Sequence, residues 1–250
     1  MKVVACYSIK GGVGKTASAV NLAHAAAKAG LRTLLIDLDP QGASSFYFRV
    51  QPSAKKWAAR FFDAYEDLVG NIKASDYDKL DILPAHLGFR NADTQLAGFP
   101  KRERRMKRIL KGFKDEYDLV VLDCPPSIGY LAEAVFVAAD IVLVPVIPTT
   151  LSERTFEQLL AFFADGDYRL DRIVPFFSMV QAQKSLHQST MAAMRARHPA
   201  FLATTIAHSS DIEKMGEYKA PVDAFARGKP AGQAYRALWD ELATALRLPG

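Results

Sequence analysis

The sequence predicts an α/β fold, a single domain in which helices cover both faces of a mostly parallel, twisted sheet. Apolar runs that suit buried strands alternate along the chain with segments of helical periodicity, which is the pattern of parallel strands joined by helices. The chain has 250 residues, of which 50% are hydrophobic and 24% are charged, so it can bury a large core. We therefore expect residues 1–250 to form one domain.

The expected elements follow one another in this alternation. The first strand is predicted at residues 2–9 (KVVACYSI), and the glycines after it lead into a helix at 15–29. Gly30 is expected to end that helix, because glycine is favoured just past helix ends. Further strands are expected at residues 32–39, 79–85, 118–126, 140–148, 172–180 and 201–207. Further helices are expected around residues 58–69, at 101–114, at 152–164 and from Gln233 onward.

Two of these helices carry informative patterns. In the basic run KRERRMKRILKGFK, residues 101–114, apolar residues fall at i, i+3, i+4 and i+7 and predict a helix that packs on the sheet and exposes its charge; they are Met106, Ile109, Leu110 and Phe113. That charge is compatible with a solvated face, with phosphate contact and with partner docking. In the last helix the apolar residues also share one face, and the other face mixes both signs of charge, as in a helix that packs on a core.

Composition limits the function classes. No stretch approaches the ~20 uninterrupted apolar residues of a membrane span, and no signal-peptide pattern opens the chain, so a cytoplasmic location is expected. Cys6 and Cys124 lie in apolar strand-like runs, which favours buried thiols over a disulfide. A net charge of +5 permits contact with nucleic acid or anionic lipid and establishes neither.

The stretch SIKGGVGKTA, residues 8–17, predicts a phosphate-binding loop. It matches the pattern G-x-x-x-x-G-K-[ST] at Gly14, Lys15 and Thr16, but Ile9 stands at the first glycine and a second lysine, Lys10, opens the loop. Small residues let the backbone turn tightly, so that successive N–H groups converge on phosphate oxygens at a helix N-terminus. Lys15 would reach the β and γ phosphates and Thr16 would ligate Mg²⁺. The candidate nucleotide-binding residues of the loop are Lys10, Gly11, Gly12, Val13, Gly14, Lys15, Thr16 and Ala17.

Three acidic residues are expected at the same edge of the sheet. Asp37 and Asp39 follow the apolar run TLLI, and Asp123 follows LVVL. In open α/β sheets ligands bind outside the carboxyl ends of strands, so all three can face one phosphate group. Asp123 fits a carboxylate that holds Mg²⁺ through water. Of Asp37 and Asp39, one would support the metal and the other would orient water.

Four motifs in order, KGGVGKT, LLIDLDPQG, LVVLDCPPSIG and LVPVIPTTLSERTF, resemble the ParA/MinD family of deviant Walker ATPases, which are P-loop NTPases. The resemblance implies that Lys10 is the signature lysine that reaches the partner's nucleotide in an ATP-bound sandwich homodimer. It also implies that Asp39 positions the attacking water, so that Lys10, Lys15 and Asp39 are the catalytic residues. Thr16, Asp37 and Asp123 would then hold Mg²⁺. Adenine contacts are expected near Phe177, Ser178 and Pro221.

Two segments, DPQG and AFARGKPAGQAYRALWDEL, resemble the partitioning branch of this family. That branch implies an ATP dimer that binds DNA non-specifically on the nucleoid, and a ParB-like or other adaptor that stimulates slow ATP hydrolysis. The cargo would be a plasmid, a chromosome or a protein cluster. The candidate DNA-binding residues are Arg195, Arg197, Lys214, Lys219, Arg227 and Lys229.

Three other functions compete with this one. A membrane-associated MinD-like protein would end in an amphipathic basic helix, whereas the last helix here has nearly neutral charge and the sequence ends at RLPG, so no membrane partner is expected. An amide-forming enzyme of the same superfamily would need a substrate pocket beside the γ phosphate. An iron protein would need cysteines placed to share a cluster across a dimer, and neither Cys6 nor Cys124 is so placed.

Overall fold

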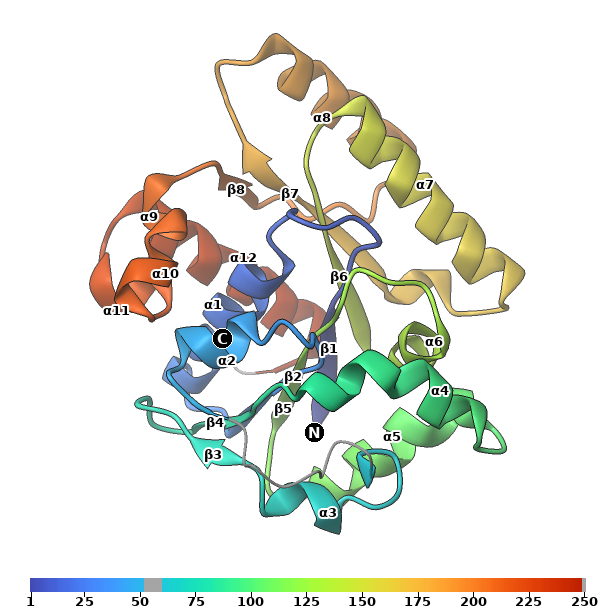
Figure 1. Cartoon of the computed structure of the whole chain (residues 1–250). Helices are drawn as coiled ribbons and strands as arrows, with labels where there is room; N and C mark the ends of the chain where they lie inside the picture. Colours follow the sequence, from blue (N-terminus) through green and yellow to red (C-terminus); the bar gives the residue numbers. More distant parts are fainter. Residues whose placement is uncertain (52–59, 249–250) are drawn as a thin grey trace.

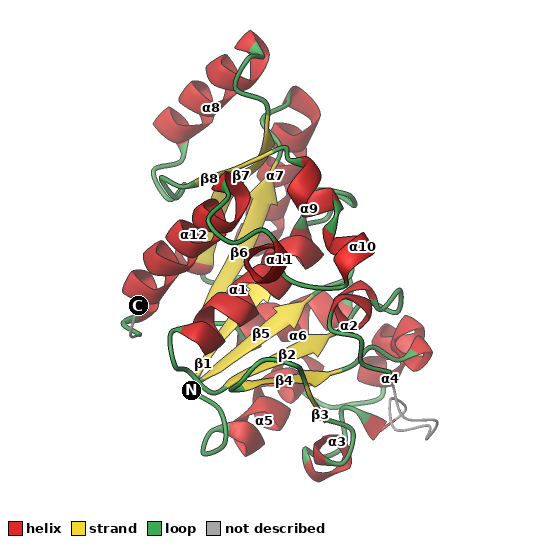
Figure 2. Ribbon diagram, turned by 90° about the vertical axis from the view of Figure 1, so that its left-hand side faces the viewer, coloured by secondary structure: helices red, strands yellow, loops and turns green. Residues whose placement is uncertain are grey.

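The described part of the chain folds around one sheet. The computed structural model describes residues 1–51 and 60–248, and within them eight strands form a sheet in the order β3-β4-β2-β5-β1-β6-β7-β8. The strands pair in parallel, apart from the antiparallel pair of β3 and β4. Helices lie on both faces of this sheet (Figures 1 and 2). The predicted α/β fold with a mostly parallel sheet is confirmed.

The predicted strands all occur, and each is shorter than the range that the sequence predicted for it. The strands are β1 Lys2–Cys6, β2 Thr33–Asp37, β3 Lys73–Ala74, β4 Leu80–Leu83, β5 Leu119–Asp123, β6 Ile141–Val146, β7 Ile173–Val180 and β8 Thr205–Ala207. The strands β2, β5 and β6 are buried along their whole length, which is why they read as continuous apolar runs. The two-residue β3 was not predicted, because it offers no such run.

The helices join these strands and cover the sheet. They are α1 Lys15–Lys28, α2 Ala43–Tyr47, α3 Glu66–Val69, α4 Ala92–Ala97, α5 Arg105–Leu110, α6 Tyr130–Ala138, α7 Thr150–Asp165, α8 Ser185–Arg197, α9 Ser210–Glu213, α10 Met215–Tyr218, α11 Val222–Phe225 and α12 Pro230–Leu246, with short 3-10 helices η2 Leu87–Asn91, η3 Arg102–Arg104, η4 Lys111–Phe113 and η5 Leu170–Arg172. Of the helix expected around residues 58–69, positions 58 and 59 lie outside the described residues, and the described part is helical as α3 only at its end.

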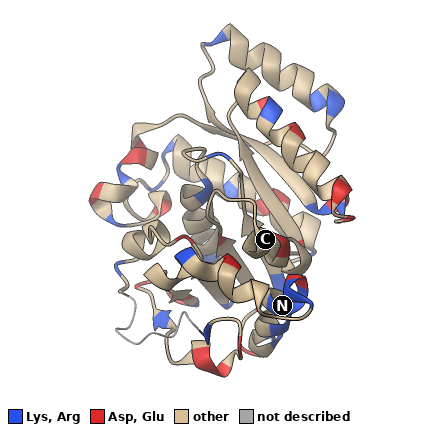
Figure 3. Cartoon of the chain, turned by 45° about the vertical axis from the view of Figure 1, so that its right-hand side comes forward, with Lys and Arg blue, Asp and Glu red and all other residues tan. Residues whose placement is uncertain are grey.

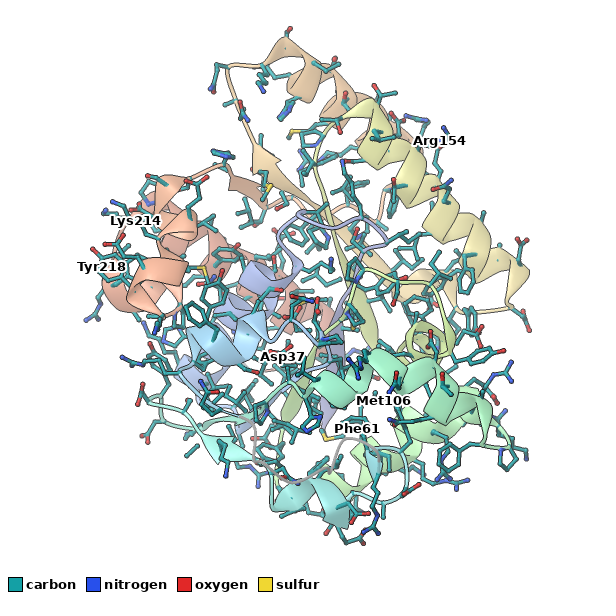
Figure 4. All side chains as sticks on the ribbon, viewed as in Figure 1. Asp37, Phe61, Met106, Arg154, Lys214 and Tyr218 are labelled. Atoms are coloured by element: carbon teal, nitrogen blue, oxygen red, sulfur yellow. The ribbon has the colours of Figure 1, made fainter. Side chains whose placement is uncertain are left out.

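Two apolar clusters, one on each face, make up the core. One contains Phe61 and Met106, labelled in Figure 4, and the inner faces of α5, α6 and α7. The other contains the inner faces of α1 and α12. The predicted apolar face of the last helix is buried as expected, with Leu238 fully covered and Trp239 3% exposed. The basic run is broken into η3, α5 and η4, yet its four predicted apolar residues are at most 2% exposed.

Both cysteines are buried free thiols, as predicted. Within residues 1–51 and 60–248, no helix has the length and apolarity that crossing a bilayer requires.

Candidate nucleotide-binding site

The loop between β1 and α1 has the backbone of an anion cradle. Gly12 and Gly14 have φ values of 69° and 94°, in the left-handed region that favours glycine. Gly14 immediately precedes α1, and the side chain and N–H of Ser18 both bond its carbonyl oxygen, at 2.8 and 3.0 Å. The first N–H groups of a helix have no partner within the helix, so this loop and the start of α1 suit an anion, which the helix dipole also favours.

Lys15 lies across this loop. Its ammonium nitrogen donates to the carbonyl oxygen of Lys10 at 3.3 Å, and the residue is only 7% exposed. Burial lowers the pKa of Lys15, and the charge of Asp123 opposes that shift. The ammonium group thus lies inside the cradle, close to the acidic edge of the sheet.

Asp37 and Asp123 are neighbours on adjacent strands. The parallel register of β2 and β5 pairs them directly, and both are fully buried. Asp37 Oδ2 accepts from the N–H and the hydroxyl of Ser45, at 2.8 and 2.7 Å. Asp123 Oδ2 accepts from the hydroxyl of Ser44 at 2.7 Å, and the Thr16 side chain also bonds to this carboxylate. Burial raises the pKa of both groups, and the charge of Asp123 raises the pKa of Asp37 further.

The residues present fit a magnesium ion. Within the described part of the chain, the second oxygens of both carboxylates, Asp37 Oδ1 and Asp123 Oδ1, are buried without a hydrogen-bond partner. A buried carboxylate oxygen without a partner is costly, and a hard cation bonded through oxygen removes that cost. The hydroxyl of Thr16 also interacts with Asp123. No group of three or more His, Cys, Asp or Glu that could hold a metal occurs among residues 1–51 and 60–248. The remaining ligands would therefore be phosphate oxygens and waters, as is usual for Mg²⁺.

Asp39 lies outside this buried pair. It is partly exposed, two residues beyond the end of β2, and its Oδ1 accepts from the N–H of Gln41 at 2.9 Å in a tight turn. Its charge nevertheless acts on Lys15 and on Asp123. Asp39 is thus close enough to the cradle to act on its charged groups, and it is partly exposed to solvent.

Lys10 points towards α7. Its ammonium nitrogen lies 3.2 Å from the hydroxyl oxygen of Ser152, in the first turn of that helix. The neighbouring glycines, Gly11 and Gly12, are exposed. Sequence reasoning missed Ser152, although it lies inside the stretch LVPVIPTTLSERTF that carries the family resemblance.

The three residues expected near the adenine have different environments. Ser178 lies against the loop, because a Cβ placed on Gly14 would come within 3.0 Å of its hydroxyl oxygen. The ring of Phe177 is fully buried and stacks on Phe201 with a centroid distance of 4.2 Å. Any contact between Phe177 and adenine would therefore involve its main chain. Pro221 precedes α11, and the next N–H, that of Val222, donates to Asn21 Oδ1 of α1 at 2.8 Å.

Sequence reasoning gave no site role to Ser44 and Ser45. In the structure α2 begins at Ala43, and the hydroxyls of Ser44 and Ser45 donate to the buried carboxylates of Asp123 and Asp37. Ser45 Oγ also accepts from the N–H of Ala85 at 2.8 Å, which ties the end of β4 to the same carboxylate. The available signal was two adjacent hydroxyl residues directly after the acidic turn.

Comparison with known proteins assigns the family. A family model described as an AAA domain (AAA_31) matches residues 1–172, which is more than half of the chain. Over 146 residues the chain is 36% identical to the sporulation initiation inhibitor protein Soj of Bacillus subtilis, covering 58% of this chain and 58% of that protein. The chain belongs to this family and is of the ParA/MinD type. It spans little more than half the length of the curated relative that it matches.

Solved structures of low identity share the fold of this ParA/MinD-type chain. A plasmid partition protein from Borrelia burgdorferi bound to AMPPNP has a TM-score of 0.81 at 22% identity, over 98% of this chain and 99% of that one. The cobyrinic acid a,c-diamide synthase of Mycobacterium smegmatis, with bound ADP and magnesium, has a TM-score of 0.81 at 24% identity, over 99% of this chain and 96% of that one. The contents of both structures are consistent with the predicted cofactors, ATP and Mg²⁺.

The six basic residues predicted to bind DNA in this ParA/MinD-type chain do not form one cluster of free charges. Arg195 donates to the carbonyl oxygens of Leu202 and Ala203, and Arg197 forms ion pairs with Glu153 and Glu157. The other four lie in the segment that contains α9, α10 and α11, where Figure 4 labels Lys214 at the periphery. Lys219 lies over the ring of Phe46, Lys229 pairs with Asp211, and Lys214 and Arg227 are exposed. Their contact with DNA stays a prediction.

Proposed function

We propose that the protein is a Mg²⁺-dependent ATPase that dimerises when it holds ATP, binds DNA non-specifically as a dimer and positions or segregates a cargo in the cytoplasm, on the nucleoid. A ParB-like or other adaptor would stimulate its slow hydrolysis. The observation that carries this proposal is the second loop lysine. Lys15 already lies inside the cradle of its own chain, whereas the ammonium group of Lys10 lies against Ser152 of α7. The two residues after Lys10, Gly11 and Gly12, are exposed.

The carboxyl edge of the sheet supports a dimer. Large apolar side chains are exposed just after the ends of five parallel strands, β2, β4, β5, β6 and β7; they are Phe46, Leu87, Ile128, Leu151 and Leu186. Between them, a Cβ on Gly11 would meet no atom within 4 Å. This edge therefore combines apolar side chains with an open turn, which suits a second copy of the chain.

The chemistry would proceed with each side chain in a separate role. The loop N–H groups and Lys15 bind the phosphates, and Thr16, Asp37 and Asp123 hold Mg²⁺, which supplies charge neutralisation at the phosphate oxygens. Asp39 orients the attacking water from the solvent side. Lys10 of one chain adds a cation to the nucleotide of the other, so that hydrolysis depends on dimerisation. ATP then stabilises the dimer by mass action, and its loss releases the two chains.

The experiment is sedimentation and DNA retardation with ADP and with a non-hydrolysable ATP analogue. A dimer is expected with the analogue only, together with a gain in DNA affinity over the ADP state. Lys10→Ala should remove both the dimer and the gain. A monomer in both nucleotide states, or equal DNA affinity in both, would overturn the switch.

The same samples test two alternative functions. Binding to anionic vesicles would indicate a membrane-positioning protein, and an amide product formed with ATP would indicate a synthase.

A further inference from the structure

The basic run of residues 101–114 presents one side of its helical turns to solvent. Four cations recur at i, i+3, i+7 and i+10 and are all exposed; they are Arg104, Lys107, Lys111 and Lys114, here called the basic stripe. The apolar residues on the other side are buried in the core, each at most 2% exposed. Burial of that apolar side fixes the direction of the stripe, because helical residues three and four apart share a face.

The stripe borders two adjoining hollows of about 230 and 480 Å³. Lys107 and Arg172 line both of them. The smaller hollow is also lined by Val3 and Asp140, at the starts of β1 and β6, while Arg172 precedes β7. This is the amino edge of the sheet, opposite the phosphate loop. Figure 3 shows the corresponding group of basic segments beside the N-terminus.

Acidic partners neutralise little of this charge. The carboxylates that line the hollows are those of Asp140 and Asp167, and Asp140 accepts from the N–H of Val3 at 2.8 Å. Among the described residues, neither Lys107 nor Lys111 has a carboxylate within ion-pair distance. Lys114 pairs with the exposed Asp115 at 4.0 Å, and Arg104 with the partly exposed Glu103 at 3.6 Å. Ion pairs between neighbouring residues at the surface contribute little.

Arg172 adds a fixed cation to the stripe. Its guanidinium donates to the carbonyl oxygens of Ala139 and Val137, at 2.8 and 3.4 Å. These bonds orient the group without neutralising it. Like charges one helical turn apart repel each other and destabilise the helix, so the stripe has a cost that an anionic partner would remove.

We propose that the basic stripe and Arg172 form a contact surface for the phosphate backbone of nucleic acid, acting in both nucleotide states. The four stripe residues span ten positions through α5 and its flanking 3-10 turns, or roughly 15–20 Å at about 1.5–2 Å per residue. That length suits a repeating polyanion better than one small anion. Exposed lysines make mobile point charges, as non-specific phosphate contact requires. A lipid surface is less suited, because an interfacial helix needs a free apolar face and this one is buried.

This surface goes beyond the proposed function, in which ATP switches DNA binding through the dimer. The stripe lies at the opposite edge of the sheet from Gly11. A dimer formed at the carboxyl edge would therefore leave the stripe of each chain exposed to solvent. Each monomer would then keep a weak, salt-sensitive attachment to DNA, and the dimer would carry two such surfaces and gain from multivalency.

The test compares two triple variants with the same change in net charge. Lys107→Gln, Lys111→Gln and Lys114→Gln together remove the stripe's lysines, and Lys73→Gln, Arg90→Gln and Arg154→Gln together are the control on β3, η2 and α7. Duplex DNA affinity is measured with ADP between about 50 and 200 mM salt. The stripe variant should lose affinity on the order of 100-fold at about 0.1 M salt, and its salt slope should fall by about 3, since each phosphate contact contributes about 0.9.

The control should stay within about twofold of the parent, and replacing the three stripe lysines by arginine should keep the affinity, since both carry the charge. Thermal unfolding verifies that each variant is folded. Equal affinity in the stripe and control variants would overturn the proposal, as would a stripe-dependent interaction with anionic vesicles or an acidic peptide and none with DNA. The increase in DNA affinity from the ADP state to the ATP-analogue state is also measured in the stripe variant, and it tests the proposed switch separately. The failure of one proposal therefore leaves the other standing.

Discussion

Lys10 and Ser152 are in contact within one chain, with the ammonium nitrogen 3.2 Å from the hydroxyl oxygen. The hydroxyl of Thr149 also donates to Ser152 Oγ, at 3.1 Å, and Ser152 is only 4% exposed. If Lys10 serves the nucleotide of a second chain, it has to leave this acceptor first. A hydrogen bond to a charged group contributes about 1.5–3 kcal/mol, so the contact would oppose dimerisation measurably.

Ser152→Ala is therefore expected to strengthen the ATP dimer. Loss of the acceptor frees Lys10, and the dimer dissociation constant with a non-hydrolysable analogue should fall by about tenfold, which corresponds to about 1.4 kcal/mol. Sedimentation at a series of protein concentrations measures it. Thr155→Ala is the control, because its hydroxyl bonds to Leu151 O within the same helix. A weaker dimer in Ser152→Ala would mean that Ser152 acts in the dimer itself.

Gly11→Val is expected to leave the monomer intact and to block the dimer. A Cβ at this position meets no atom within 4 Å, and Gly11 does not have the positive φ of Gly12 and Gly14. The free energy of unfolding should change by less than about 0.5 kcal/mol, and nucleotide affinity should be largely kept. The branched side chain would obstruct the face that the two loops share. Titration of a fluorescent nucleotide and sedimentation measure the two effects, and a normal ATP dimer would contradict the shared face.

Gly14→Val is the matched comparison for that variant. Gly14 has φ of 94°, and its Cβ would lie 3.0 Å from Ser178 Oγ, so the backbone of the cradle has to distort. This variant should lose nucleotide binding as well as the dimer.

The parts of the site that local sequence determines were predictable. The glycine loop, and the acidic residues that end buried strands, follow from patterns within a few residues, so Lys15, Asp37 and Asp123 were placed correctly at the carboxyl edge. The serine hydroxyls that bond to the carboxylates and to Lys10 were not predictable in this way. Ser44 meets Asp123 across 79 positions and Ser152 meets Lys10 across 142. Such contacts depend on how helices dock on the sheet, which a single sequence does not specify.

Local propensity also failed where packing dominates. The basic run was predicted as one helix, and the structure interrupts it with 3-10 turns at both ends of α5. Its apolar period was nevertheless correct, because burial of that side on the sheet is what selects the residues.

His24 is expected to make stability depend on pH. It is 5% exposed and packs edge-on against Tyr77 at 4.7 Å, and burial, followed by the charge of Lys28, lowers its pKa to about 4. The unfolded chain, with a pKa near 6.5, binds the proton more readily than the folded one. Stability is thus complete above about pH 6.5 and falls towards pH 4, by up to about 1.4 kcal/mol per pH unit.

Urea unfolding of the parent and of His24→Gln between about pH 4 and 7 isolates that contribution. A glutamine side chain does not titrate, so the difference between the two free energies of unfolding should shrink as the pH falls. A pH-independent difference would mean that the folded chain accommodates the charged imidazole.

Asp39 is expected to act in hydrolysis and not in binding, and two variants separate its charge from its turn. Its Oδ1 accepts from the N–H of Gln41, a bond that an asparagine at this position would keep and an alanine would lose. If the carboxylate orients the attacking water, both Asp39→Asn and Asp39→Ala should slow phosphate release by roughly 10²–10⁴-fold while the ATP dimer still forms. Full activity in Asp39→Asn would assign the residue to the turn alone.

The Asp39→Ala protein, held in its ATP state, should also retain the adaptor that normally triggers hydrolysis. Affinity capture with this variant therefore identifies partners that require the dimer, and Lys10→Ala, which should not dimerise, is the control.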